Sequence, residues 1–294
     1  MKKLTIFSTI ILLCSSVELW ALGPVNSNQL SDVRVRQAIA YAIDMETIQE
    51  TLLEGMAIVA DSHLPNGPWK APGLNLYKYD PDKARKLLKE ANWDSNRELD
   101  LVYYYGDQLT VDLMTAVQAY LADVGIKMSF RKLEGDTGAQ LWTAPKDPIN
   151  GPAAVKWDLG YGAIAALAFQ EYFDRYQTGH AINSHTPGSP ELDKLIKAIY
   201  STSDVEKQKT AFMALQRYEN EDLFTIPLYY QQLFIFENNR LNRNGGSYGN
   251  AQFNYDWNIV DWTVTPDKNG KQVFYTNTGA FNFVRTPWTN PGLW

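Results

Sequence analysis

The alternation of apolar and polar residues is most regular between residues 32 and 55. Apolar residues such as Val33 and Ile43 recur there at the spacing of one helical face. Asp32 directly precedes them and suits an N-cap, because its carboxylate can accept hydrogen bonds from the first free amides. The pattern predicts an amphipathic helix over residues 32–55 with a break near Asp44.

The same reasoning predicts the elements that follow. Helical spacing and capping signals predict helices over residues 80–91, 110–124, 170–176, 189–196 and 206–222. Short apolar or alternating runs predict strands over residues 17–22, 99–104, 126–133, 157–164, 231–236 and 257–264, and a hairpin turn at 268–271. The strand–helix–strand order over residues 99–133 favours an α/β fold with some parallel pairing.

Five stretches of the chain, taken in order, resemble the signature of a known family. They are the helix that opens with Asp-Val-Arg-Val-Arg-Gln-Ala at residue 32, the Tyr-Asp-Pro helix that begins at residue 79, the helix–Gly–Ile–strand unit at 110–133, Pro-Glu-Leu-Asp at 190–193, and Ile-Pro-Leu-Tyr-Tyr at 226–230. Together they are similar to family 5 extracellular solute-binding proteins, the peptide, dipeptide and nickel receptors of bacterial ABC importers.

The resemblance implies an α/β fold: a periplasmic-binding-protein-like lobe (type II, cluster C) with a mixed sheet flanked by helices and a C-terminal β segment. In that family the helix at 32 opens the second of two lobes, a few hundred residues into the chain. The expected organisation is a signal peptide over 1–16, an inter-lobe strand over 17–30, lobe two over 31–238, and a segment returning to lobe one, with a hairpin, over 239–294. Most of lobe one would then be encoded separately or lost.

The N-terminus has the pattern of a secretory signal. Lys2 and Lys3 precede an apolar stretch, Leu4 to Leu13, that is too short to span a membrane. Small residues favour cleavage after Ser16, with cleavage after Ala21 as the alternative, and a misplaced start codon would also produce this pattern. We expect a periplasmic or otherwise extracytoplasmic protein.

Composition narrows the classes of partner. The chain has 27 basic and 33 acidic residues in 294, and no long basic run, which argues against nucleic acid as a partner. Its single cysteine, Cys14, falls within the predicted signal, so no disulfide framework is expected. Aromatic residues make up 13%, enough either for a large core or for a surface that stacks on ligands.

The resemblance implies a ligand bound between the lobes and a membrane permease as partner. By position, the residues of lobe two that would contact the ligand are Glu134, Asp136, Trp142, Tyr161, Gly162, Ala163, Ile164, Ala165, Tyr229 and Tyr230. Peptide-binding members usually carry an Asp soon after the strand at 157–164, whereas this chain has no acid there before Glu171. Either Asp136 or Glu171 takes the place of that Asp, or the ligand is not an ordinary peptide with a free amino group. Because peptide binding dominates the family, we expect an oligopeptide receptor, with an oligosaccharide receptor of the same family as the alternative.

No residue pattern requires catalysis or a cofactor. The three histidines, His63, His180 and His185, lack the spacing of a metal site, and no nucleophile elbow or phosphate-binding loop is present. The expected protein is a binding protein and not an enzyme, with no cofactor and no metal. A secreted α/β hydrolase, or a module that binds another protein, are the competing interpretations.

Overall fold

A computed structural model describes residues 15–21, 29–65, 67–148, 153–164, 172–184, 189–231, 238–244 and 259–265. The chain divides into two compact units. We call the first, Cys14–Gln232, the main unit; the second consists of Met1–Leu13 and Leu233–Trp294.

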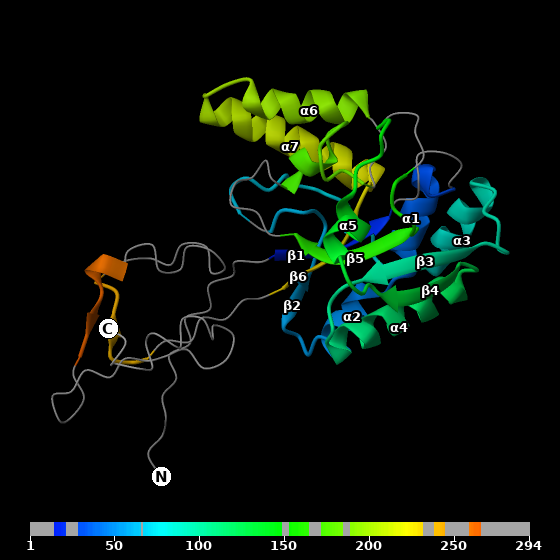
Figure 1. Cartoon of the computed structure of the whole chain (residues 1–294), viewed down its shortest axis with the longest axis horizontal. Coiled ribbons are helices and arrows are strands. Elements are labelled where there is room, and N and C mark those ends of the chain that lie inside the picture. Colours follow the sequence, from blue (N-terminus) through cyan, green and yellow to red (C-terminus); the bar gives the residue numbers. More distant parts are fainter. Residues whose placement is uncertain are drawn as a thin grey trace, which may run out of the picture. The chain divides into compact units, whose positions relative to one another are not determined.

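The main unit is built on one six-stranded sheet (Figure 1). Its strands are β1 (Ser15–Ala21), β2 (Ala57–Val59), β3 (Glu98–Tyr103), β4 (Lys127–Lys132), β5 (Leu159–Ile164) and β6 (Ile226–Gln231). They lie in the order β2-β6-β1-β5-β3-β4. β3 pairs in parallel with β4 and β5, whereas β1 runs antiparallel to both β5 and β6. The structure confirms the predicted α/β class with a mixed sheet.

Helices cover both faces of this sheet (Figure 1). They are α1 (Val33–Ala42), α2 (Met45–Thr51), α3 (Pro81–Glu90), α4 (Gln108–Asp123), α5 (Thr137–Trp142), α6 (Pro190–Tyr200) and α7 (Val205–Asp222), with short 3-10 turns η1 (Gln29–Ser31) and η3 (Asp174–Tyr176). Strand alternation divides the core: Leu99 and Leu101 of β3 pack with α1, α3 and α4, while Val102 packs with α6 and α7. No helix in the described ranges is both long enough and apolar enough to cross a membrane.

Each of these seven α-helices begins with a side chain that accepts a hydrogen bond from a first-turn amide. The capping residues are Asp32, Asp44, Asp80, Asp107, Asp136, Ser189 and Asp204. Capping satisfies amides that have no partner within the helix, which fixes where each helix starts. The predicted break near Asp44 is confirmed, because α1 ends at Ala42 and Asp44 caps α2.

The last strand of the sheet lies earlier in the chain than predicted. Residues 231–236 were expected to form it, whereas β6 spans Ile226–Gln231 and residues 232–237 lie outside the described ranges. Pro227 argues against a strand, since proline cannot donate to a ladder. The structure accommodates it at a bulge: Val17 of β1 pairs with Tyr229, and the next residue, Glu18, pairs with Pro227.

The strand β1 includes residues assigned above to a signal peptide. Ser15 pairs with Gln231, and Ser16 pairs with both Ile164 and Tyr230. Residues 1–14 are outside the described ranges, so the signal peptide and its cleavage site stay predictions. Cleavage after Ser16 would remove two residues of β1, and cleavage after Ala21 would remove the whole strand.

In the second unit the described residues form a short hairpin, β7 (Leu241–Asn242) with β8 (Thr263–Val264), next to the 3-10 turn η4 (Ile259–Asp261). The guanidinium of Arg243 lies 4.1 Å from the ring centroid of Trp262. The predicted strand over 257–264 is therefore replaced over its described part by a turn and a two-residue strand. The predicted hairpin turn at 268–271 lies outside the described residues.

Candidate functional site

The carboxyl ends of four strands meet at one edge of the main unit's sheet. β3, β4, β5 and β6 all run toward it, because β1 is antiparallel to both β5 and β6. In open α/β sheets ligands bind outside the carboxyl ends of the strands. We call this edge the carboxyl edge; it is the candidate site.

Of the three predicted residues after β4, Glu134 and Asp136 are exposed and Trp142 is half-buried. Glu134 pairs with Lys132 across 3.5 Å, with four-fifths of its side chain exposed. Asp136 caps α5 by accepting from the amide of Ala139 at 3.0 Å. Trp142 ends the same helix and packs partly buried against the α6–α7 core. Asp136 thus stabilises the start of α5, whereas Glu134 caps no helix.

The predicted residues of β5 are mostly buried. Tyr161 is 3% exposed, and its hydroxyl lies 3.1 Å from that of Tyr229 on β6, itself buried. Gly162 is buried and Ala163 half-buried. Ile164 is the last residue of the strand and Ala165 lies outside the described residues.

Tyr230, the last of the predicted residues, points into a polar cluster. Tyr230 is 2% exposed. Its hydroxyl accepts a hydrogen bond from Lys70 at 2.6 Å and donates one to the carbonyl of Ser62 at 2.8 Å. Lys70 also pairs with Asp61. These contacts hold the loop after β2, which gives Tyr230 a structural role in this conformation.

Sequence reasoning missed the residues that follow β3. Tyr104 and Tyr105 lie where β3 leaves the sheet, with their ring centroids 4.3 Å apart and a 2.9 Å hydrogen bond from the Tyr104 hydroxyl to that of Tyr105. The backbone amide of Ala163 donates to the Tyr105 hydroxyl at 3.1 Å. The rule that places ligands at carboxyl ends of parallel strands, applied to the run Tyr103–Tyr104–Tyr105, would have found them.

The pairing of β5 with β3 stops before Ala163. The register of β3 with β5 runs from Leu101↔Leu159 to Tyr103↔Tyr161 and ends there. The Ala163 amide faces the β3 side, where it meets a side chain instead of a strand. Since the N–H and C=O of a strand residue point to the same side, the Ala163 carbonyl faces that side too.

The tyrosine hydroxyls near the edge are neutral hydrogen-bonding groups. Burial raises the pKa of Tyr105 and, well above its ordinary value, that of Tyr161; it raises the pKa of Tyr229 as well. Charged groups stand near these phenols: Asp107 adds a smaller rise to the pKa of Tyr161 and Tyr229, and Lys132 and Glu134 stand at the end of β4 and just after it. The group that contacts the Ala163 amide is the neutral Tyr105 hydroxyl, which suits a neutral part of a ligand.

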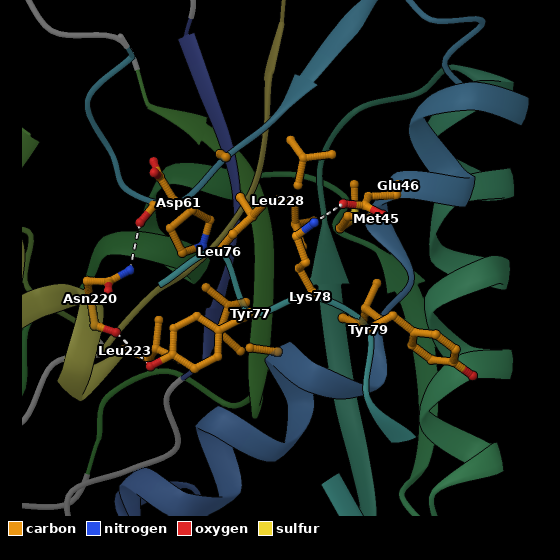
Figure 2. Close-up of a pocket in the computed structure, with 16 residues that line it drawn as sticks. Met45, Glu46, Asp61, Leu76, Tyr77, Lys78, Tyr79, Asn220, Leu223 and Leu228 are labelled. Carbon is orange, nitrogen blue, oxygen red and sulfur yellow. Dashed lines mark hydrogen bonds and ion pairs between the residues drawn. The ribbon is translucent and has the colours of Figure 1, made fainter. Parts of the chain in front are cut away.

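A separate pocket lies away from the carboxyl edge, between the ends of α1 and α7 and the loop before α3 (Figure 2). Its volume is about 20 Å³, room for a water molecule or two. Its polar groups bond to one another: Tyr77 donates to the Asn220 carbonyl at 2.7 Å, and Asn220 donates to the Asp61 carbonyl at 2.8 Å. Within the described residues no group of three His, Cys, Asp or Glu side chains is arranged to hold a metal.

A family sequence model described as "Bacterial extracellular solute-binding proteins, family 5 Middle" matches residues 16–223. The oligopeptide-binding protein AppA of Bacillus subtilis is 27% identical over 233 residues, which cover 71% of this chain and 40% of AppA. The oligopeptide-binding protein OppA of Lactococcus lactis is 28% identical over 224 residues, which cover 68% of this chain and 36% of OppA.

Solved structures share the fold. AppA from Bacillus subtilis, in complex with a nonapeptide, matches with a TM-score of 0.67 and 22% identity over 87% of this chain and 52% of that one. A mannohexaose-bound periplasmic oligopeptide-binding protein from Thermotoga maritima matches with a TM-score of 0.62 and 21% identity, over 83% of this chain and 49% of that one. The chain thus spans about half the length of these structures, and its alignments cover less than half of the curated relatives AppA and OppA.

Proposed function

The chain belongs to family 5 of the bacterial extracellular solute-binding proteins, and from that premise we propose that it binds oligopeptides for an ABC importer. The family consists of binding receptors and not of enzymes, and its members act outside the cytoplasm. The proposal has three further parts. The chain delivers its ligand to a membrane permease, a signal peptide directs its export, and the first lobe is encoded separately.

One observation carries the peptide assignment: among the described residues, β5 pairs with no strand on its β3 side at Ala163, where its amide donates to a side chain instead. An extended peptide can add to such an edge as a further strand, accepting from the Ala163 amide and donating to its carbonyl. Main-chain hydrogen bonds of this kind supply affinity without depending on the ligand's side chains. AppA, named for oligopeptides and solved with a nonapeptide, supports the same ligand class.

The missing acid after β5 bears on which part of the peptide lies there. A buried ammonium group needs a charged partner, and no acidic residue follows β5 in the sequence before Glu171. We propose that internal peptide groups, and not the α-amino group, lie beside Ala163. Peptides with acetylated and free N-termini should therefore differ little in their contact with this strand.

The test is calorimetric titration of the full chain with peptides of three to nine residues. We expect peptides to bind. We expect N-methylation of the peptide's backbone amides to weaken that binding at least tenfold. Ala163→Pro removes the strand's donor and should weaken binding, while Ala163→Gly serves as the matched control because it keeps the amide. Peptide binding that ignores both N-methylation and Ala163→Pro would count against strand addition.

An oligosaccharide is the second candidate, favoured by the half-buried pair of rings of Tyr104 and Tyr105 and by the mannohexaose in the Thermotoga maritima structure. Sugars stack on aromatic rings and present neutral hydroxyls, which suits the neutral phenol beside Ala163. Titration with mannohexaose in parallel with peptides separates the two. Binding of the sugar but of no peptide would replace the first proposal by the second.

A further inference from the structure

The amide of Ala163 has a hydrogen-bond partner within the chain. It donates to the hydroxyl oxygen of Tyr105 at 3.1 Å, and the hydroxyl of Tyr104 donates to the same oxygen at 2.9 Å. That oxygen therefore accepts two hydrogen bonds from the groups around it. A ligand carbonyl that is to accept from Ala163 must first take the place of this phenol.

We propose that Tyr105 is a placeholder for the ligand's carbonyl, and that its displacement sets the affinity of the backbone subsite at Ala163. The inference rests on the proposed function, because it assumes that a peptide main chain lies on this edge. Tyr105 then sets the affinity for the peptide, a role separate from the packing of its ring.

The geometry supports displacement because the ring and the hydroxyl have different surroundings. The ring packs edge-on against Tyr161, with centroids 5.9 Å apart and planes at 76°, and adds to the core beneath the sheet. The hydroxyl reaches beyond the last β3–β5 pair, Tyr103↔Tyr161, to the backbone of β5 at Ala163. The ring and the hydroxyl move as one rigid group, and because Tyr105 is half-buried, rotation about its Cα–Cβ bond can take the hydroxyl off the amide while the ring shifts at the margin of the core.

The exchange is favourable for a peptide because a backbone carbonyl accepts hydrogen bonds strongly. Burial raises the pKa of Tyr105, so the phenol stays neutral and remains the weaker acceptor of the two. The ligand nevertheless has to break the bond from the Ala163 amide to this hydroxyl before it gains its own. Removing the hydroxyl should therefore tighten peptide binding.

The experiment compares the full-length Tyr105→Phe and Tyr104→Phe variants with the wild type. Tyr105→Phe keeps the ring and frees the Ala163 amide, so Kd for the peptide that binds the wild type should fall three- to tenfold. Tyr104→Phe removes a hydroxyl of the same pair but leaves the Ala163–Tyr105 contact, and should change Kd less than twofold. Unchanged or weaker peptide binding by Tyr105→Phe, measured beside normal wild-type binding, overturns the placeholder.

A second readout needs no ligand. Hydrogen exchange at the Ala163 amide, followed by NMR, should quicken at least fivefold in Tyr105→Phe and stay near the wild-type rate in Tyr104→Phe. Equal exchange in all three proteins means that the hydroxyl does not hold the amide, and this also overturns the inference. Faster exchange with no peptide binding by either protein would instead reject the proposed function, and the ligand's part of the inference with it.

Discussion

The guanidinium of Arg36 closes the C-terminal end of α7 by donating to the backbone carbonyl of Asp222 at 2.6 and 2.9 Å. A third nitrogen donates to the carbonyls of Leu30 and Ser31, which precede α1. Arg36 is 4% exposed, and its carboxylate partner is also Asp222, at 3.1 Å. One side chain in the most recognisable helix of the sequence thus joins two segments 186 residues apart.

We expect Arg36→Met to lower the free energy of unfolding by about 3–4 kcal/mol, because it leaves buried carbonyls and the Asp222 carboxylate without their donor. Urea unfolding followed by circular dichroism measures this. Arg34→Met is the matched control two residues away: Arg34 has 44% of its side chain exposed, and its loss should lower the free energy of unfolding far less than the loss of Arg36. Equal losses from the two variants would contradict the assigned role of Arg36.

A second buried pair joins His63 and Glu219, both fully buried, with 3.4 Å between Nε2 and Oε1. The other ring nitrogen of His63 lies 3.2 Å from the carbonyl of Tyr172, which can only accept, so that nitrogen carries a proton. Thr225 bridges the two side chains. Glu219→Gln should lower the free energy of unfolding by about 2–4 kcal/mol.

The control for that variant is Glu221→Gln, since Glu221 is on the same helix and exposed. It should change the free energy of unfolding by about 0.5 kcal/mol or less. Thermal unfolding of the three proteins at one pH decides the matter. A Glu219→Gln variant as stable as Glu221→Gln would show that the buried pair contributes nothing.

Stability should decline in alkali, in part through Tyr77. Burial raises the pKa of Tyr77 to about 12 from an ordinary value near 10. The unfolded chain therefore releases this proton first, and the stabilisation is complete below pH 10 and lost as the pH rises through 12. Its size is about 1–2 kcal/mol, allowing for the partial exposure of the ring. Urea midpoints between pH 9 and 12 should fall less steeply in Tyr77→Phe than in the wild type.

The strand β1 should be indispensable to the main unit. It lies between β5 and β6 and pairs with both along its length, so a chain starting at residue 22 leaves two strands of the sheet without their common neighbour. We expect chains 15–294 to unfold cooperatively and chains 22–294 to lose cooperative unfolding, as followed by differential scanning calorimetry. A cooperative transition at the same temperature in both would disprove this.

Local signals in the sequence predicted much of this fold. Asp32 caps the helix that it was expected to cap, and the helix predicted from residue 80 begins at Pro81 after its cap Asp80. Asn92, just after α3, adopts the left-handed conformation (φ 53°) that asparagine tolerates. Such features depend on a few neighbouring residues, whose chemistry is visible in the sequence. The strand at Ile226–Gln231 was misplaced because the bulge that tolerates Pro227 forms only against β1, more than 200 residues away.

The candidate site was predicted less completely for the same reason. Tyr161 and Tyr229 sit on strands whose two faces are both covered, so position along the chain could not show that their rings point into the core. The contact between Tyr105 and Ala163 arises where the β3–β5 register stops, and the sequence contains no local sign of that point. The ligand-binding role of the ten predicted residues stays a prediction.

The register pair Ser15↔Gln231 has a consequence for how this fold can be combined with others. Antiparallel partners stand about 5 Å apart, so the polypeptide enters and leaves the main unit through neighbouring positions. Inserted domains have the same arrangement, with their two ends close together. A host protein can accept such a domain in a surface loop, because the two ends of the cut loop need to move apart only slightly. The unit is thus a self-contained module, suited to transfer between longer polypeptides and to grafting into a loop of an engineered carrier.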